Sequence, residues 1–139
     1  FSIPENLYLV GLMNTADRSL AMVDYALRRR FGFVDLEPGF DTDQFRELLI
    51  GRGTEEKFFE RVIDRLATVN QHIAEDHANL GKGYRIGHSY FCTLPEERGL
   101  DLALYLRIIR WEIEPLLREY WFDNPEKAES LIKELKLVD

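Results

Sequence analysis

Three polar residues lie at the end of the first apolar segment, and the first of them has a side chain suited to contacting a nucleotide phosphate. Asn14 ends the apolar run of residues 7–13, and Asp17 and Arg18 follow within the same turn. Ligands of open α/β sheets bind beyond the carboxyl ends of the strands. A neutral amide at such a strand end can orient an attacking water or contact the terminal phosphate without adding negative charge. The alternatives are an Asn14 that bonds its own backbone in a turn, an Asp17 that begins a helix and a solvated Arg18.

Three consecutive arginines, Arg28, Arg29 and Arg30, end the helix that is predicted after this turn. Cations near a helix C-terminus complement the helix dipole by typically ~0.3–1 kcal/mol each, which is the structural interpretation. The functional interpretation is an arginine finger that reaches a neighbouring subunit's nucleotide. A guanidinium suits this role because it stays charged and its planar fork meets phosphate oxygens bidentately. Arg29 and Arg30 are the favoured fingers, and the pattern does not choose between them.

The glycine-rich segment after residue 80 adds Arg85 and His88. From the residues alone, Arg85 is a loop arginine paired with a carboxylate, and the family resemblance given below adds a contact with phosphate as the alternative. His88 is either functional or a hydrogen-bonded loop histidine. His72 and His77 are five residues apart, which misses the three- or four-residue spacing of one helix face, so we predict no metal site there.

The two motifs by which a P-loop NTPase holds phosphates and magnesium are absent from this sequence. A P-loop reads Gly-x-x-x-x-Gly-Lys-Ser/Thr, and its backbone N–H groups wrap the phosphates. In Gly81-Lys82-Gly83 the residue after lysine is glycine. Residues 33–37 resemble the acidic strand-end motif only faintly, because their acids are not adjacent. We therefore expect this chain alone to be inactive and to bind nucleotide weakly.

These candidates depend on a strand-helix-strand unit for their positions. Residues 7–13 are almost continuously apolar, as in a strand buried on both faces of a parallel sheet. Apolar residues at helical spacing follow over residues 16–27. Residues 31–36 predict a second strand, ended by Pro38-Gly39. Because two parallel strands are not stable alone, we interpret the chain as a fragment whose other strands precede Phe1.

Residues 40–139 predict a helical subdomain. Asp41 or Thr42 caps a short helix that ends at Ile50, and Thr54 caps a long helix. A helix over residues 100–114 is kinked or restarted at Pro115, and the last helix has Pro125 at its first position. Core or lid packing is expected for the aromatic group Trp111, Tyr120, Trp121 and Phe122, and stacking on a base is the alternative.

Composition excludes several classes of protein. Apolar residues make up 45% of the 139-residue chain and charged residues 31%, which is typical of a soluble globular domain. The net charge of −7 argues against a dedicated DNA-binding face. Cys92 is the only cysteine, which excludes an internal disulfide. The first residues do not show the pattern of a signal peptide, and no apolar run is long enough to predict a membrane span. These features favour a cytoplasmic location.

Three separated strings in the sequence resemble the McrB family of AAA+ GTPases. They are Met13 to Ser19 with Asp24 to Phe31, then Leu80 to Cys92, then Pro115-Leu116-Leu117 with Glu119-Tyr120 and Phe122-Asp123. The resemblance implies an α/β plus all-α fold. Residues 1–39 would be the C-terminal part of the AAA+ α/β subdomain, with the sensor-one strand, the arginine-finger helix and the last strand. Residues 40–139 would be the helical lid subdomain.

The resemblance also implies an activity and partners. The complete protein would be the GTP-hydrolysing motor subunit of a modified-cytosine-specific restriction endonuclease, driving DNA translocation and cleavage with GTP and Mg²⁺. It would form a hexameric ring, bind an McrC-like endonuclease subunit, and read DNA through a separate N-terminal domain. The family pattern makes Asn14 the sensor-one residue, Arg29 or Arg30 the finger and Arg85 a sensor-two candidate. It gives Asp17 and Arg18 catalytic-site or subunit contacts.

Other interpretations remain open at this point. Residues 14–17 are also similar to the guanine-reading Asn-Lys-x-Asp element of small GTPases, although they occupy the place of an AAA+ phosphate sensor. The chain could belong to an ATP-using MoxR-type chaperone, against which the string over residues 81–89 argues. It could also be a helical module that docks a partner. Nucleotide preference, the DNA target and the oligomeric state of the chain do not follow from the residues themselves.

Overall fold

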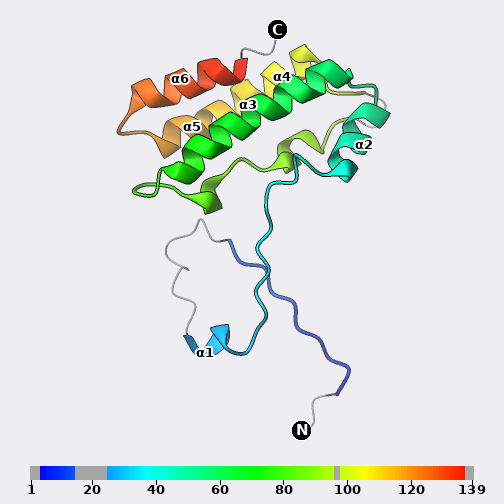
Figure 1. The fold of residues 1–139 in the computed structure, drawn as a ribbon, viewed down its shortest axis with the longest axis vertical. Helices are drawn as coiled ribbons and strands as arrows, with labels where there is room; N and C mark the ends of the chain where they lie inside the picture. Colours follow the sequence, from blue (N-terminus) through cyan, green and yellow to red (C-terminus); the bar gives the residue numbers. More distant parts are fainter. Residues whose placement is uncertain (1–3, 15–24, 96–97, 137–139) are drawn as a thin grey trace. The chain divides into compact units, whose positions relative to one another are not determined.

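The computed structural model describes residues 4–14, 25–95 and 98–136, and the chain divides into two compact units, residues 1–34 and 35–139. All regular structure that the described residues form is helical. Figure 1 shows the helices of the second unit. They are α2 (Asp43–Gly51), α3 (Glu56–Glu75), α4 (Leu102–Ile108), the π-helical turn η3 (Ile109–Ile113), α5 (Glu114–Tyr120) and α6 (Pro125–Lys136), with 3-10 turns η1 (Lys82–Tyr84) and η2 (His88–Phe91).

The strands predicted over residues 7–13 and 31–36 are not formed by these described residues. The large apolar side chains of both segments are exposed, as in Val10 at 89% and Leu12 at 93%. A parallel strand needs neighbours for its backbone hydrogen bonds and cover on both faces, and two short segments of one chain provide neither. The helix predicted between the segments is described only as α1 (Tyr25–Arg28), because residues 15–24 lie outside the described part.

Local capping residues set the ends of two helices as the sequence predicts. The Thr42 hydroxyl accepts from the backbone N–H of Phe45 at 3.3 Å and caps α2. Pro125 is the first residue of α6, and the Asn124 side chain accepts from the N–H of Lys127 at 3.2 Å. Both caps satisfy N–H groups that have no partner within the helix, so the predictions of Thr42 and Pro125 are confirmed.

Thr54 does not cap α3, which corrects the prediction. Residue Glu55 occupies the cap position without a side-chain hydrogen bond, and the buried Thr54 hydroxyl instead accepts from the N–H of Leu100 at 2.8 Å. The segment before α4 approaches so closely that a Cβ on Gly99 would lie 2.4 Å from the Thr54 nitrogen. Only glycine allows this approach, and the resulting tertiary hydrogen bond replaces the predicted cap.

The core lies along one face of α3. The sequence places six residues on that face at helical spacing, of which Ile63 is only partly buried. The other five are buried: Phe59, Val62, Leu66, Val69 and Ile73. Helix α6 packs against α3 and against α5.

Helix α4 is joined to α3 and to α6 through its residue Tyr105. The ring of Phe58 on α3 meets the Tyr105 ring edge-on at 6.0 Å, and the buried Tyr105 hydroxyl donates to the carbonyl of Leu135 in α6 at 2.8 Å. Burial raises the pKa of Tyr105 far above its usual range, so this hydroxyl stays a neutral donor.

The helix predicted over residues 100–114 has three parts. Pro115 lacks the N–H that would continue the α-helical ladder, and the chain forms the π-helical turn η3 directly before it. This turn buries Ile109 and Ile113 and leaves Trp111 between them 70% exposed. The prediction of core or lid packing is therefore correct for Trp121, at 1% exposure, and for the partly buried Tyr120, and it is wrong for Trp111 and for Phe122, at 81%.

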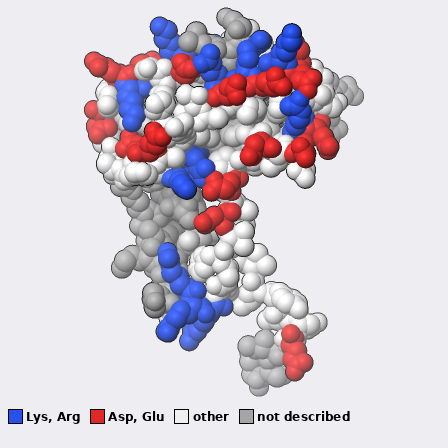
Figure 2. All heavy atoms as spheres, in the orientation of Figure 1, with Lys and Arg blue, Asp and Glu red and all other residues white. Residues whose placement is uncertain are grey.

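Charges of both signs share the surface of the helical unit, as Figure 2 shows. Several ion pairs join neighbouring helices across it: Arg46–Glu56, Arg65–Glu134, Arg118–Glu129 and Lys136–Glu114. None of the helices that the structure describes is long and apolar enough to cross a membrane.

Candidate functional site

A hollow of about 480 Å³ lies between residues 37–41, helix α3 and Arg85, all within the second unit. Its apolar lining comes from Pro38, Phe40, Ile63, Ala67 and Ala74, and its polar lining from Glu37, Asp41, Asn70, Gln71 and Arg85. Small-molecule sites typically have ~300–1,000 Å³ of space, mostly apolar walls and a few placed polar groups. The hollow has a volume in that range, although polar residues make up half of its lining, and one of them is Arg85, which the sequence singles out.

Arg85 is tied to the segment that precedes α2. Its guanidinium forms an ion pair with Glu37, and its Nε donates to the carbonyl of Lys82 at 2.9 Å. The Arg85 side chain is 21% exposed and that of Glu37 is 60% exposed. Of the two interpretations of Arg85, the carboxylate pairing describes this structure, and the contact with phosphate stays a prediction.

Asn70 anchors the loop that carries Arg85, and it is not among the site residues predicted from the sequence. Its side-chain amide donates to the carbonyl of Ile86 at 2.9 Å and accepts from the N–H of Ile86 at 2.6 Å. Asn70 and Ile86 are both buried, so these two bonds satisfy polar groups that water does not reach. The signal was present: Asn70 follows Val69 on the apolar face of α3, and a buried asparagine needs partners.

His88 contacts the same segment at a second point. Its Nδ1 accepts from the backbone N–H of Gly39 at 2.9 Å, so this nitrogen carries no proton in the structure. The ring packs edge-on against Phe40 and Phe45, with centroids 6.2 and 5.6 Å away. A Cβ on Gly39 would lie 3.2 Å from His88 Cε1, tighter than ordinary contact. His88 is thus the hydrogen-bonded loop histidine of the sequence analysis.

The other predicted site residues belong to the first unit. Asn14 is exposed, Arg28 ends α1, and Arg29 and Arg30 follow in an exposed turn. Asp17 and Arg18 lie outside the described residues. The roles predicted for these residues therefore stay predictions. Within the second unit, Arg85 and His88 both contact the short segment of residues 37–39.

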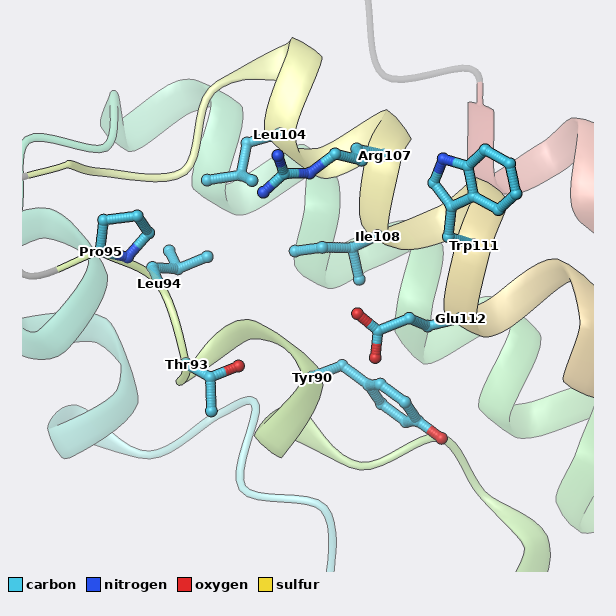
Figure 3. Close-up of a pocket in the computed structure, with 9 residues that line it drawn as sticks. All are labelled: Tyr90, Thr93, Leu94, Pro95, Leu104, Arg107, Ile108, Trp111 and Glu112. Atoms are coloured by element: carbon cyan, nitrogen blue, oxygen red, sulfur yellow. The ribbon is translucent and has the colours of Figure 1, made fainter.

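A second hollow of about 270 Å³ lies beside α4 and the π-helical turn. Figure 3 shows Leu94 and Ile108 pointing toward each other across it, with the Glu112 carboxylate beside Tyr90 and Trp111 at the rim. The Trp111 ring also has the Arg110 guanidinium 5.4 Å from its centroid. None of the candidate site residues of the sequence lines this hollow.

Two comparisons with known proteins relate the chain to one family. A family model described as "McrB, alpha-helical lid domain" matches residues 61–129. A curated relative, the type IV methyl-directed restriction enzyme EcoKMcrB subunit of Escherichia coli (strain K12), is 51% identical over 136 residues. The match covers 97% of this chain and 30% of that protein, so the chain spans less than a third of the relative's length.

Proposed function

Because this chain belongs to the McrB family, we propose that the complete protein is the GTP-hydrolysing motor subunit of a modified-cytosine-specific restriction endonuclease. The observation that carries the proposal is the 51% identity to the E. coli methyl-directed restriction subunit, which extends over 97% of this chain. The match includes the first 39 residues almost entirely, so the proposal does not depend on the lid alone.

We assign residues 1–39 to the end of the AAA+ α/β subdomain and residues 40–139 to the helical lid. In the complete protein, residues 7–13 and 31–36 would pair with preceding strands of a parallel sheet. The exposed apolar side chains of these segments, such as Val10 and Leu12, support this proposal because a sheet and its helices would cover them.

The hollow beside Arg85 fits a nucleotide base better than a chain of phosphates. Its lining residues include two acids, Glu37 and Asp41, and one cation, Arg85, which already pairs with Glu37. Such a lining would repel a triphosphate, whereas Pro38 and Phe40 offer apolar area to a ring. We propose that the base of GTP lies here, with phosphates and Mg²⁺ held by a P-loop and an acidic motif in the preceding part of the protein.

Hydrolysis would rest on positioning and on charge stabilisation of the transferred phosphoryl group. Asn14 would orient the attacking water as the sensor-one residue, and Arg29 or Arg30 would reach the nucleotide of the next subunit in a hexameric ring. Asp17 and Arg18 would contribute catalytic-site or subunit contacts. The sensor-two role that the family pattern gives Arg85 would require its guanidinium to leave Glu37 for a phosphate. The partner would be an McrC-like endonuclease subunit in the cytoplasm, and DNA would be read by a separate domain.

The test is a titration of the complete protein with GTP and with ATP, with and without Asn14→Ala. Preferential GTP binding, with hydrolysis lost in the variant, is the expected result. A preference for ATP would move the protein to the MoxR-type chaperones. Absence of binding to either nucleotide would overturn the proposal in favour of a helical docking module.

A further inference from the structure

The segment that joins the two units is held to the helical unit at two points. The Arg85 guanidinium pairs with Glu37, and His88 Nδ1 accepts from the N–H of Gly39 at 2.9 Å. Both contacts are made by residues 85–88, and their partners, Glu37 and Gly39, are two positions apart in the sequence. Between them Pro38 lines the hollow with Arg85.

The loop of residues 85–88 is itself fixed to α3. Ile86 is 1% exposed, and both its backbone N–H and its carbonyl bond to the buried Asn70 side chain. One side-chain amide therefore bonds to both backbone polar groups of a single residue and holds the loop against the helix. Arg85 and His88 on either side of Ile86 therefore project from a firmly held backbone.

Gly39 is restrained on both sides of its backbone. Its N–H bonds to His88, and its carbonyl accepts from the Thr42 hydroxyl at 2.8 Å, while Thr42 caps α2. The next residue, Phe40, is 7% exposed and packs edge-on against the His88 and Phe91 rings. Gly39 and Phe40 are thus held to the helical unit.

We infer that residues 85–88 form a two-point clamp, in which Arg85 on Glu37 and His88 on Gly39 make residues 37–40 move with the helical unit. The part of the chain that belongs to the helical unit then begins before Glu37, which agrees with the division of the chain between Val34 and Asp35. Arg85 and His88 are positioning residues in this view. The functional consequence rests on the proposed GTPase activity: the clamp transmits the orientation of the lid to residues 31–36 and the preceding arginines.

The first test measures amide hydrogen exchange of Gly39 by NMR in this 139-residue chain. His88→Phe keeps the ring but removes the acceptor, and we expect Gly39 exchange to accelerate about fivefold to tenfold, the effect of losing one net hydrogen bond. His88→Asn places an amide oxygen near the Nδ1 position and should restore slow exchange. The Leu66 amide in α3, slow in every variant, verifies that the fold is intact. Unchanged Gly39 exchange in His88→Phe would overturn the contact between His88 and Gly39.

The second test separates the clamp from a phosphate contact by Arg85 in the complete protein. If the clamp operates, Glu37→Gln and Arg85→Gln lower kcat to a similar extent with KM little changed. The double variant is then no worse than either single one, and the exchanged pair Glu37→Arg with Arg85→Glu recovers part of the rate. The contact between Arg85 and Glu37 would be overturned by a Glu37→Gln protein that retains full kcat, together with a raised KM in Arg85→Gln and no recovery of the rate in the variant with the two charges exchanged.

The two tests also distinguish failure of the clamp from failure of the proposed function. Gly39 exchange depends only on the folded chain and on the His88 acceptor. A complete protein that hydrolyses no GTP would refute the proposed activity, while accelerated Gly39 exchange in His88→Phe would still establish the contact between His88 and Gly39.

Discussion

The indole N–H of Trp121 donates to Asp76 Oδ2 at 2.7 Å and ties the end of α5 to the end of α3. Lys127 of α6 contacts the same oxygen at 3.0 Å and lies 4.6 Å from the centre of the Trp121 ring. One carboxylate thereby holds three helices at a corner of the helical unit. The bonds from Trp121 and Lys127 lower the pKa of Asp76 below its ordinary value of 3.8.

We expect Asp76→Asn to lower the free energy of unfolding by ~1–2 kcal/mol at pH 7, because the charged acceptor of both bonds is lost. Since the pKa of Asp76 is lower in the folded than in the unfolded state, its contribution is present above about pH 3.8 and disappears as the pH falls through the folded value. Urea unfolding at pH 7 and pH 3 measures both effects. Asp64→Asn, on the exposed side of α3, is the control. An equal loss at both pH values would contradict the assignment to the ionised carboxylate.

Replacing Asn70 by alanine should destabilise the chain by ~2–4 kcal/mol, because it leaves the buried N–H and carbonyl of Ile86 without partners. Gln71→Ala is the neighbouring control. Its exposed side chain bonds only within α3, to Glu75 at 2.8 Å, and its loss should cost under ~0.5 kcal/mol. Thermal or chemical unfolding of the two variants provides the comparison. Similar stabilities would show that the Asn70 contact does not hold the loop.

Two glycines should respond to alanine in opposite directions. A Cβ on Gly99 would lie 2.4 Å from the backbone nitrogen of Thr54 and 2.6 Å from the carbonyl carbon of Gly53, so Gly99→Ala should cost more than ~2 kcal/mol. Gly51, the last residue of α2, has open space where its Cβ would be, and Gly51→Ala should be neutral or stabilising by up to ~1 kcal/mol. Differential scanning calorimetry measures both, and a tolerated Gly99→Ala would refute the close approach at Thr54.

The two tryptophans should differ in their access to a quencher. Trp111 is 70% exposed and Trp121 is 1% exposed. Acrylamide should therefore quench the fluorescence of Trp121→Phe, which retains Trp111, several-fold more efficiently than that of Trp111→Phe. Trp121→Ala should cost ~3–5 kcal/mol, and Trp111→Ala far less, because only the first leaves a cavity in the core. Equal quenching of the two single-tryptophan variants would contradict the orientation of the π-helical turn.

The long helix, its buried face and the caps at Thr42 and Pro125 follow from the sequence, because helical periodicity and capping depend on residues within a few positions of each other. The family also follows, since its strings keep their order along the chain. The sequence likewise lists Arg85 and His88 as candidates, but it leaves two interpretations of each.

Only the tertiary structure decided what those side chains contact. The hydrogen bond from Gly39 to His88 joins residues 49 positions apart, and those from Asn70 to Ile86 join residues 16 positions apart. The Thr54 hydroxyl does not cap a helix as predicted but accepts from the N–H of Leu100, 46 positions away. Residues 7–13 carry the pattern of a strand, yet they form none here, because the partners of a parallel strand are contributed by other parts of a sheet. Local patterns determine which elements a chain can form, whereas pairing between distant segments depends on which surfaces folding brings together.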